Sequence, residues 1–253
     1  MADMMKIEDA RVIYLSEPCL VINKLPGEAV EGAGAGMVNL PVVLAEQFGG
    51  VQAGGGLFFP TAIHRLDVPV SGCVLFARTS KARSVLNTAF AEGRVEKHYW
   101  AIIEMPPPAF TLPETGELVH WLITDTKRNK TIAYTEDPPH RHLKKAVLRY
   151  RIRGRGIRYL FLEIELLTGG HHQIRAQLAR LGLHIKGDLK YGARRGEKNG
   201  GIRLHAYSLA FPNPAIATRP STPGDRVQVT ALPPVRDALW EAFADMDQSS
   251  AMN

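Results

Sequence analysis

The stretch TAIHRLDVPVSGCVLFART, residues 61–79, decides how we interpret the rest of the chain. Its second half, residues 73–77, is continuously apolar and predicts a buried strand. The polar HRLD segment (64–67) and the Ser71-Gly72 pair before it predict a constrained loop. We therefore expect Asp67 to lie in a loop at the edge of a sheet, where a carboxylate can face a ligand. Taken alone, a loop Asp equally indicates a turn or a helix cap.

The flanking segments predict a mixture of helices and strands without regular βαβ alternation. After Ser80, expected to cap a helix, apolar residues recur at i, i+3, i+4, i+7 and i+8, and Gly93 ends the pattern. This order favours an α+β fold with a largely antiparallel sheet flanked by helices. We expect one catalytic domain over 1–253, with a recognisable core at 11–232 and a disordered tail at 246–253. The other predicted strands are 11–15, 20–23, 98–104, 159–167 and 227–231, and the other predicted helices are 39–48, 172–181 and 236–245.

Composition excludes several classes of protein. With 253 residues, 45% of them hydrophobic and 22% charged, the chain is neither a disordered protein nor a fibrous repeat. Cys19 and Cys73 both sit in apolar runs and are predicted to be buried free thiols. The N-terminus has no apolar core typical of a secretory signal, and the glycine-rich stretch 47–63 does not suit a bilayer-spanning helix. We expect a cytoplasmic protein.

Positive charge is concentrated in two windows. Residues 127–158 hold eleven Lys or Arg against two acids, and residues 175–203 hold eight against two, whereas the whole chain carries only +6. Such asymmetry is typical of a basic face that binds a polyanion, most often nucleic acid, although a solvated basic surface gives the same pattern.

Three partial motifs, for dinucleotide binding, metal binding and serine-hydrolase chemistry, fail on closer comparison. The glycines at 32–36 fail the dinucleotide pattern because Met37 takes the place of its last glycine. Adjacent His171 and His172, together with His184, suggest a metal site, but no metal-binding spacing accompanies them, and neighbouring histidines on a helix are expected to point apart. Hydrolase chemistry of the G-x-S-x-G type is also absent.

A second stretch, LLTGGHHQIRAQLARLGLHIKGDLKYG at 166–192, predicts a strand, a glycine turn and a helix. Together the two stretches resemble the RluA-type RNA pseudouridine synthases, and the resemblance covers residues 11–212 in the family's order. Because its first motif begins at Val21, we expect no accessory RNA-binding domain ahead of it. The matching segments are VINKLPG (21–27), HRLDVPVSG (64–72), KHYWA (97–101), TGGHHQIRAQL (168–178), IKGD (185–188) with Tyr191-Gly192, and LHA (204–206).

The resemblance implies an isomerase that detaches uracil from its ribose at nitrogen 1, rotates it and rejoins it through carbon 5. It implies that Asp67 is the nucleophile, attacking either the ribose anomeric carbon or carbon 6 of the base. Arg175 is implied as the cation that compensates the Asp67 charge. Tyr99 is implied to stack on the uracil and to position or relay the proton from carbon 5.

The resemblance also implies how the substrate is held. Ile174 packs on the other side of the target base, and Arg65 fills the gap that an extruded base leaves. His64, beside Arg65, is assigned to substrate binding as well, and Lys144 and Lys145 in the first basic window contact phosphates. We expect no metal or cofactor, because an isomerisation has no net redox change. The expected partner is a structured tRNA or rRNA, with no membrane and no obligate protein partner, so the enzyme is expected to be monomeric.

Three residue choices depart from the family pattern. Val70 stands in place of Thr, Gly170 in place of the Arg of TGR, and residues 212–214 in place of an HP ending. Val70 and Gly170 support one alternative, an RNA-binding or RNA-folding factor of the same fold with weakened catalysis. The intact Asp67, Tyr99 and Arg175 argue against it. A glycosidase is disfavoured because no second carboxylate stands out near Asp67.

Overall fold

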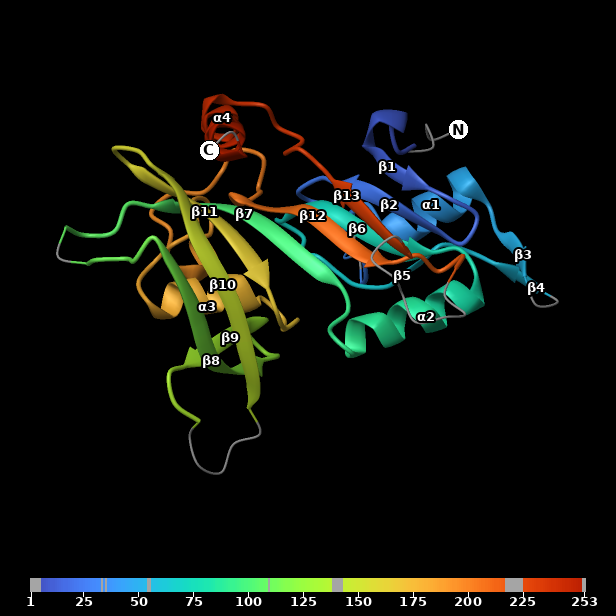
Figure 1. Cartoon of the computed structure of the whole chain (residues 1–253), viewed down its shortest axis with the longest axis horizontal. Helices are drawn as coiled ribbons and strands as arrows, with labels where there is room; N and C mark the ends of the chain where they lie inside the picture. The colour runs from blue at the N-terminus through green and yellow to red at the C-terminus, as the bar shows by residue number, and fades with distance from the viewer. Residues whose placement is uncertain are drawn as a thin grey trace. The chain divides into compact units, whose positions relative to one another are not determined.

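The computed structural model of the chain describes residues 6–32, 34, 36–53, 56–108, 110–137, 143–216 and 225–251. The chain forms two compact units (Figure 1): the first comprises 1–96 and 206–234, and the second comprises 97–205 and 235–253. In each unit helices flank a largely antiparallel sheet, which confirms the predicted α+β class. The expectation of one catalytic domain over 1–253 stays a prediction.

The first unit is built on two fully buried strands, β2 and β6, which pair antiparallel. β1 lies beside β2, β12 and then β13 follow beyond β6, and β5 also pairs with β6. Strands buried along their whole length are mostly apolar in sequence, which is why β6 is recognisable from residues 73–77. The elements are η1 (Asp9–Arg11), β1 (Val12–Leu15), β2 (Cys19–Lys24), α1 (Leu40–Phe48), β3 (Val51–Ala53), β4 (Gly56–Phe58), β5 (Thr61–Ala62), β6 (Ser71–Ala77), α2 (Ser80–Ala91), β12 (Leu204–Pro212) and β13 (Arg226–Thr230).

Helix α2 packs on β6 through its apolar stripe, which includes Leu86. Its cap differs from the prediction: Thr79, not Ser80, is the N-cap, and its Oγ1 accepts a hydrogen bond from the backbone N–H of Ala82 at 3.1 Å. Burying a leucine such as Leu86 contributes about 1.5–3 kcal/mol, so this stripe fixes the helix on the strand that leaves the Asp67 loop.

Both cysteines are free thiols buried in the first unit, as the sequence predicts. Burial raises the pKa of Cys19, and it raises the pKa of Cys73 to about 12. Both therefore remain protonated at neutral pH and act as small apolar side chains of the core.

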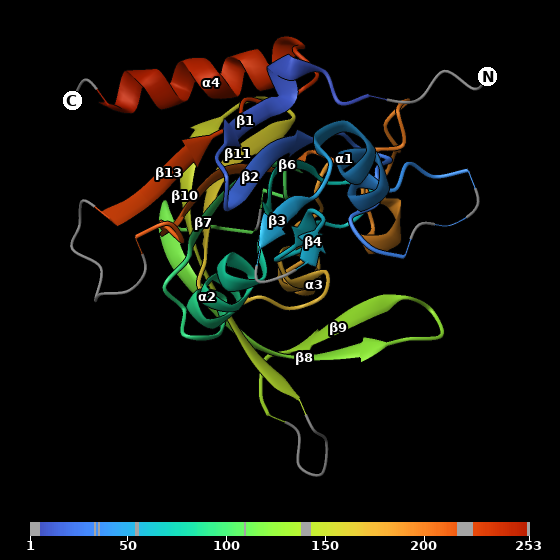
Figure 2. The ribbon, with the colours of Figure 1, turned by 90° about the vertical axis from the view of Figure 1, so that its right-hand side faces the viewer.

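The second unit is a sheet of five strands in the order β7–β11–β10–β8–β9, and all of its neighbouring pairs are antiparallel. Helix α3 lies against β8, β9 and β10, and Figure 2 shows it beside the β8–β9 hairpin. Helix α4 packs on β7 and β11 through Phe243, whose ring stacks on Trp100 at 4.5 Å and meets Phe161 edge-on at 5.6 Å. The elements are β7 (Glu96–Glu104), β8 (Thr115–Asp125), β9 (Lys130–Tyr134), β10 (Lys144–Arg155), β11 (Tyr159–Leu166), α3 (Gln173–Arg180), η2 (Leu189–Tyr191) and α4 (Ala238–Ala251).

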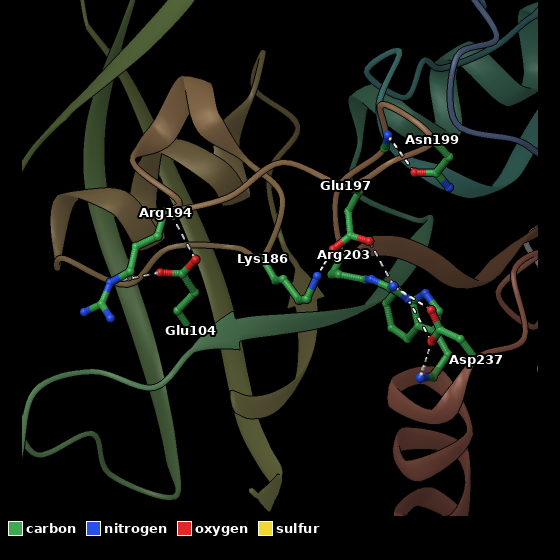
Figure 3. Close-up of polar contacts among 9 residues, drawn as sticks. Glu104, Lys186, Arg194, Glu197, Asn199, Arg203 and Asp237 are labelled. Carbon is green, nitrogen blue, oxygen red and sulfur yellow. Dashed lines mark hydrogen bonds and ion pairs between the residues drawn. The ribbon is translucent and has the colours of Figure 1, made fainter. Parts of the chain in front are cut away.

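A chain of ion pairs holds the start of α4 within this unit (Figure 3). Arg203 donates to Asp237 at 2.5 and 3.0 Å and also to Glu197 at 3.0 Å, while Glu197 pairs with Lys186. Asp237 also accepts a hydrogen bond from the backbone N–H of Trp240 at 3.2 Å. Partial burial raises the pKa of Asp237, but the hydrogen bonds from Arg203 and Trp240 outweigh it and lower that pKa overall.

Helix α4 runs to Ala251, past the end at Asp245 that the sequence predicts. Residues 246–251, expected to be disordered, are therefore helical, and 252–253 lie outside the described residues. Along the described parts of the chain, no helix has the length and apolar character needed to cross a bilayer.

Candidate active site

The loop that carries Asp67 joins β5 to β6 in the first unit, as the sequence predicts. Two backbone hydrogen bonds fix it: the Val70 N–H donates to the Asp67 carbonyl at 3.0 Å, and the Gly27 N–H donates to the Val68 carbonyl at 2.8 Å. The second bond ties the loop to the 21–27 motif. Asp67 itself is half-buried. The loop therefore holds the Asp67 backbone in place while part of the residue stays accessible.

Lys24 anchors the same loop from inside the core. It is 0% exposed, and its Nζ donates to the backbone carbonyls of Leu25, Val68 and Val70 at 2.8, 3.0 and 2.6 Å. Two of these carbonyls belong to residues that closely follow Asp67, so the lysine determines where this part of the loop lies. Sequence reasoning gave Lys24 no role, although its position two residues after the apolar run CLVI was the available signal.

The surroundings of Lys24 are balanced in charge. Burial lowers the pKa of Lys24 to about 7, although the carboxylates of Glu28 and Asp67 raise it. Arg11 also lowers this pKa, but it pairs with Glu28 at 2.5 Å, and both side chains are nearly buried. Two cations and two carboxylates thus share this region. Because the attraction between Lys24 and Asp67 is mutual, the lysine that holds the loop also supplies positive charge near the carboxylate.

Gly72 explains why the Ser-Gly pair and the LHA segment occur together. Its φ of +119° is one that side-chain-bearing residues rarely adopt, and a Cβ there would lie 2.3 Å from the carbonyl oxygen of Ala206. The strand that follows the Asp67 loop therefore passes directly against β12. Val70, the first departure from the family pattern, is 2% exposed, so its side chain is part of the core.

His64 and Arg65 occupy different environments although they are adjacent. His64 Nε2 accepts a hydrogen bond from the backbone N–H of Leu75 at 3.1 Å, and its ring stacks on Phe90 at 5.1 Å. These contacts fasten the loop to β6 and α2. Arg65 is 55% exposed and pairs with Glu31 at 3.5 Å across solvent, a contact that contributes little energy. Arg65 is thus accessible to a ligand, while the contacts of His64 are structural.

Tyr99 and Ile174 lie in the second unit. Tyr99 is in β7 opposite Ile164 of β11 and is 7% exposed, and Ile174 lies in the first turn of α3 and is 3% exposed. Neither residue projects from the surface, and their proposed contacts with a base stay predictions.

Arg175 forms a buried ion pair with Asp188. Its Nε and Nη2 donate to the two carboxylate oxygens at 2.6 and 2.8 Å, and the side chains are 4% and 1% exposed. The guanidinium also lies 4.8 Å from the centre of the Tyr191 ring. Sequence reasoning matched Asp188 to the IKGD motif but did not identify it as a partner of Arg175. The predicted pairing of Arg175 with Asp67, which belongs to the first unit, stays a prediction.

The prediction that His171 and His172 point apart is wrong. Their rings stack with centres 3.8 Å apart, because His172 adopts a left-handed conformation (φ +51°) just before α3 begins. His172 Nδ1 shares a hydrogen bond of 2.9 Å with the Tyr191 hydroxyl. Within the ranges that the structure describes, no three His, Cys, Asp or Glu side chains are grouped as metal ligands.

Lys144 and Lys145 open β10 and are both exposed. They lie opposite Leu122 and Trp121 of β8 in the sheet. The predicted site residues therefore fall into two sets: Asp67, His64 and Arg65 share one loop of the first unit, and the second unit holds Tyr99, Ile174, Arg175, Lys144 and Lys145.

Comparison with known proteins gives a consistent result for the sequence. The profile of the family described as RNA pseudouridylate synthase matches residues 19–180. An uncharacterised RNA pseudouridine synthase of Zymomonas mobilis is 32% identical over 210 residues, covering 81% of this chain and 89% of the relative. The ribosomal large subunit pseudouridine synthase D of the same organism is 27% identical over 213 residues, covering 80% of this chain and 65% of the relative.

Solved structures agree on the fold. Human RNA pseudouridylate synthase domain containing 1 superposes with a TM-score of 0.66 at 20% identity, and the match covers 98% of this chain and 97% of that one. At this identity the likeness concerns the fold alone.

Proposed function

Because the chain belongs to the RNA pseudouridylate synthase family of isomerases, we propose that it converts uridines of a structured RNA to pseudouridine, with Asp67 as the nucleophile. The proposed substrate is ribosomal or transfer RNA. The name of one Zymomonas relative, ribosomal large subunit pseudouridine synthase D, supports the ribosomal class. A cytoplasmic location and a monomeric state stay predictions of the sequence.

The proposed reaction conserves every atom of the nucleotide except one exchanged hydrogen. The bond between uracil nitrogen 1 and ribose carbon 1′ breaks, the base turns, and a bond from carbon 5 to carbon 1′ forms. The hydrogen on carbon 5 leaves to solvent as a proton, and nitrogen 1 gains a proton. No electrons are exchanged with a second molecule, so this chemistry requires no redox cofactor. A covalent intermediate with a carboxylate would keep the fragments together while the base turns.

The position of Asp67 is the observation that carries the nucleophile assignment. The residue is half-buried, and Lys24 holds the loop on its C-terminal side through the Val68 and Val70 carbonyls. A nucleophile benefits from a fixed backbone, because a reacting group held near its target no longer has to be brought there by diffusion. In its protonated form Lys24 also supplies positive charge near the carboxylate.

The other roles follow from the matched motifs. We propose that Tyr99 and Ile174 contact the target uracil and that Arg175 provides positive charge to the nucleophile. The contact of Arg175 with Asp188 supports a fixed orientation of its guanidinium, since a bidentate pair restricts it strongly. We propose that Arg65, exposed in the same loop as Asp67, fills the gap left by the extruded base.

The deciding experiment follows the hydrogen on carbon 5. Cellular RNA labelled with tritium at uracil carbon 5 is incubated with the parent protein, with Asp67→Asn and with Asp9→Asn, the same chemical change at an exposed position. We expect label release from the parent and the control, and none from Asp67→Asn, whose RNA binding stays near that of the parent.

Two results would contradict this proposal in different ways. Label release by Asp67→Asn at the parent rate would remove Asp67 from the chemistry. A parent that binds RNA but releases no label from any RNA class would favour the alternative, an RNA-binding factor with weakened catalysis.

A further inference from the structure

The second unit contains a cavity of about 360 Å³ beside the turn that leads from β11 into α3. Its volume lies within the roughly 300–1,000 Å³ typical of small-ligand sites. Its walls include the Thr168–Gln173 turn and the start of β10 with Lys144 and Lys145. The lining residues are Leu122, Ile123, Thr124, Thr131, Lys144, Lys145, Ala146, Thr168, Gly169, Gly170, His171 and Gln173.

The charge of this cavity distinguishes it from a second one in the same unit. Two lysines line the first cavity, and no Asp or Glu is among its lining residues. The second cavity, of about 590 Å³, is lined by equal numbers of arginines and glutamates: Arg149, Arg151 and Arg153 with Glu117, Glu163 and Glu165. Only the first of these two cavities therefore offers an uncompensated positive charge, which suits an anion.

The walls combine this charge with a fixed polar frame. The Gln173 side chain accepts hydrogen bonds from the Thr168 hydroxyl and the Gly170 N–H, both at 2.9 Å, and donates to the Val147 carbonyl at 3.2 Å. Thr131 donates to the His171 carbonyl at 2.7 Å. Because the polar groups of the turn form hydrogen bonds with one another and with neighbouring strands, the turn is rigid. The ammonium groups of the lysines are then the groups available to bind a ligand. No hydrogen bond or ion pair is recorded for either ammonium within the described residues.

Gly170, where the family pattern has Arg, opens this cavity. A Cβ there would lie 3.2 Å from Leu122 Cδ1 and 3.3 Å from the Gln173 side-chain oxygen, so a longer side chain starts from the cavity wall and competes for its volume. The Gly170 backbone does not have a left-handed φ, so other residues can adopt its conformation. Compared with the arginine of the family pattern, Gly170 therefore removes one positive charge. It also leaves free the volume that the arginine side chain would occupy in the cavity that Lys144 and Lys145 line.

We propose that this cavity is a second nucleotide site, which receives an unstacked nucleotide of the RNA other than the uridine that is modified. Lys144, on the same face of β10 as the buried Ala146, binds its phosphate. Leu122, which lies opposite Lys144 on β8, and the His171 ring contact its sugar and base. The inference rests on the proposed function, because it assigns an RNA to the protein. Gly170 is then a specificity residue, since its lack of a side chain admits the nucleotide.

The substitution Gly170→Arg distinguishes a nucleotide site from a merely basic surface, because the two interpretations predict opposite changes in RNA affinity. An added arginine fills the cavity, so a nucleotide bound there would be displaced and RNA affinity would fall by about tenfold, the cost of one stacked base. On a merely basic surface the same arginine adds a phosphate contact, so RNA binds more tightly and with a steeper salt dependence.

The measurement is the dissociation constant for bulk transfer RNA and for ribosomal RNA fragments, between about 50 and 200 mM salt. Gly170→Ala controls for the backbone change, and Lys81→Ala, at an exposed position on α2, controls for the loss of one charge. Replacing Lys144 and Lys145 together by Glu changes only exposed side chains, so it tests whether this end of β10 contacts RNA even if Gly170→Arg folds poorly. This double variant should bind more weakly and have a shallower salt slope.

The site is overturned if Gly170→Arg binds RNA as tightly as the parent or more tightly, or if the lysine pair behaves like Lys81→Ala. Neither result depends on turnover. A parent that isomerises no uridine refutes the proposed function through the tritium assay alone, so the two failures are distinguishable.

Discussion

Replacing Lys24 by Met tests whether the lysine positions the Asp67 loop. The two side chains are similar in length, so the change removes the ammonium and leaves the core nearly filled. Of the three carbonyls that Lys24 binds, those of Leu25 and Val68 also accept backbone hydrogen bonds, from Glu28 and Gly27. The Val70 carbonyl has no such second bond among the described contacts, so it loses its donor.

The size of the effect on stability is set by two opposing terms. A buried acceptor left without a donor costs about 1–3 kcal/mol. Against this, Met removes the cost of burying an ammonium, whose native pKa of about 7 lies below the ordinary 10.5. Below pH 7 the lysine is protonated in both states, and this opposition to folding is fully present. As the pH rises from about 7 to 10.5, the unfolded chain retains the proton that the native state has lost, so the parent gains about 1.4 kcal/mol per pH unit relative to Lys24→Met.

The assay is urea unfolding of the parent, Lys24→Met and Lys81→Met between pH 6 and pH 10, together with single-turnover rates. We expect the advantage of the parent over Lys24→Met to grow as the pH rises above 7, whereas Lys81→Met follows the parent. Catalysis by Lys24→Met should fall even where the variant is fully folded, because the residues after Asp67 lose their anchor. Parallel pH profiles for parent and Lys24→Met would refute the titration of Lys24 in this range. An unchanged single-turnover rate would refute its positioning role.

Two further predictions concern arginines with contrasting environments. Arg175→Ala should lose about 3–5 kcal/mol of unfolding free energy, because it leaves the carboxylate of Asp188 buried and unpaired; a urea midpoint equal to that of the parent would contradict this. Arg65→Ala should leave stability unchanged, since its ion pair is exposed, but should slow single turnover on a structured RNA more than on a short unpaired oligonucleotide that presents the same uridine. Equal losses on both substrates would mean that Arg65 orients the site generally and does not replace a flipped base.

The fold was predictable where the apolar pattern is strong. Strand β6 and helix α2 follow directly from an unbroken apolar run and a clear helical repeat, and both are buried against each other. The expected strands do not include β3, β4, β5, β8, β9, β10 or β12. In β10 the residues Leu148, Tyr150 and Ile152 are buried and alternate with exposed Arg149 and Arg151, which is the pattern of a half-buried strand. The exposed positions of β10 are Lys or Arg, so the segment was interpreted as a basic surface and not as an alternating strand.

The candidate site was predictable in its motifs but not in its internal contacts. Motif matching located Asp67, Tyr99 and Arg175, yet it treated Lys24 and Asp188 as ordinary members of their segments. In a sequence, a Lys or Asp indicates a surface position, because such residues are almost never fully buried unless they are paired. Only the structure supplies the partners that make burial possible: the Val70 carbonyl for Lys24 and the guanidinium of Arg175 for Asp188.

These two buried contacts also explain why motifs far apart in the sequence occur together. Lys24 of the first motif is satisfied by carbonyls of the Asp67 loop, and Arg175 of the helix motif is satisfied by Asp188 of the segment that follows. Removing one partner of the Arg175–Asp188 pair costs about 3–5 kcal/mol, a large part of the stability of a typical domain. Removing Lys24 instead leaves a buried carbonyl without its donor, which costs about 1–3 kcal/mol. Each motif therefore needs its counterpart for folding within its own unit, before any contact with RNA is considered. Replacing Asp188 should consequently lower the amount of folded protein, although the contact described for it is with Arg175 and not with a substrate.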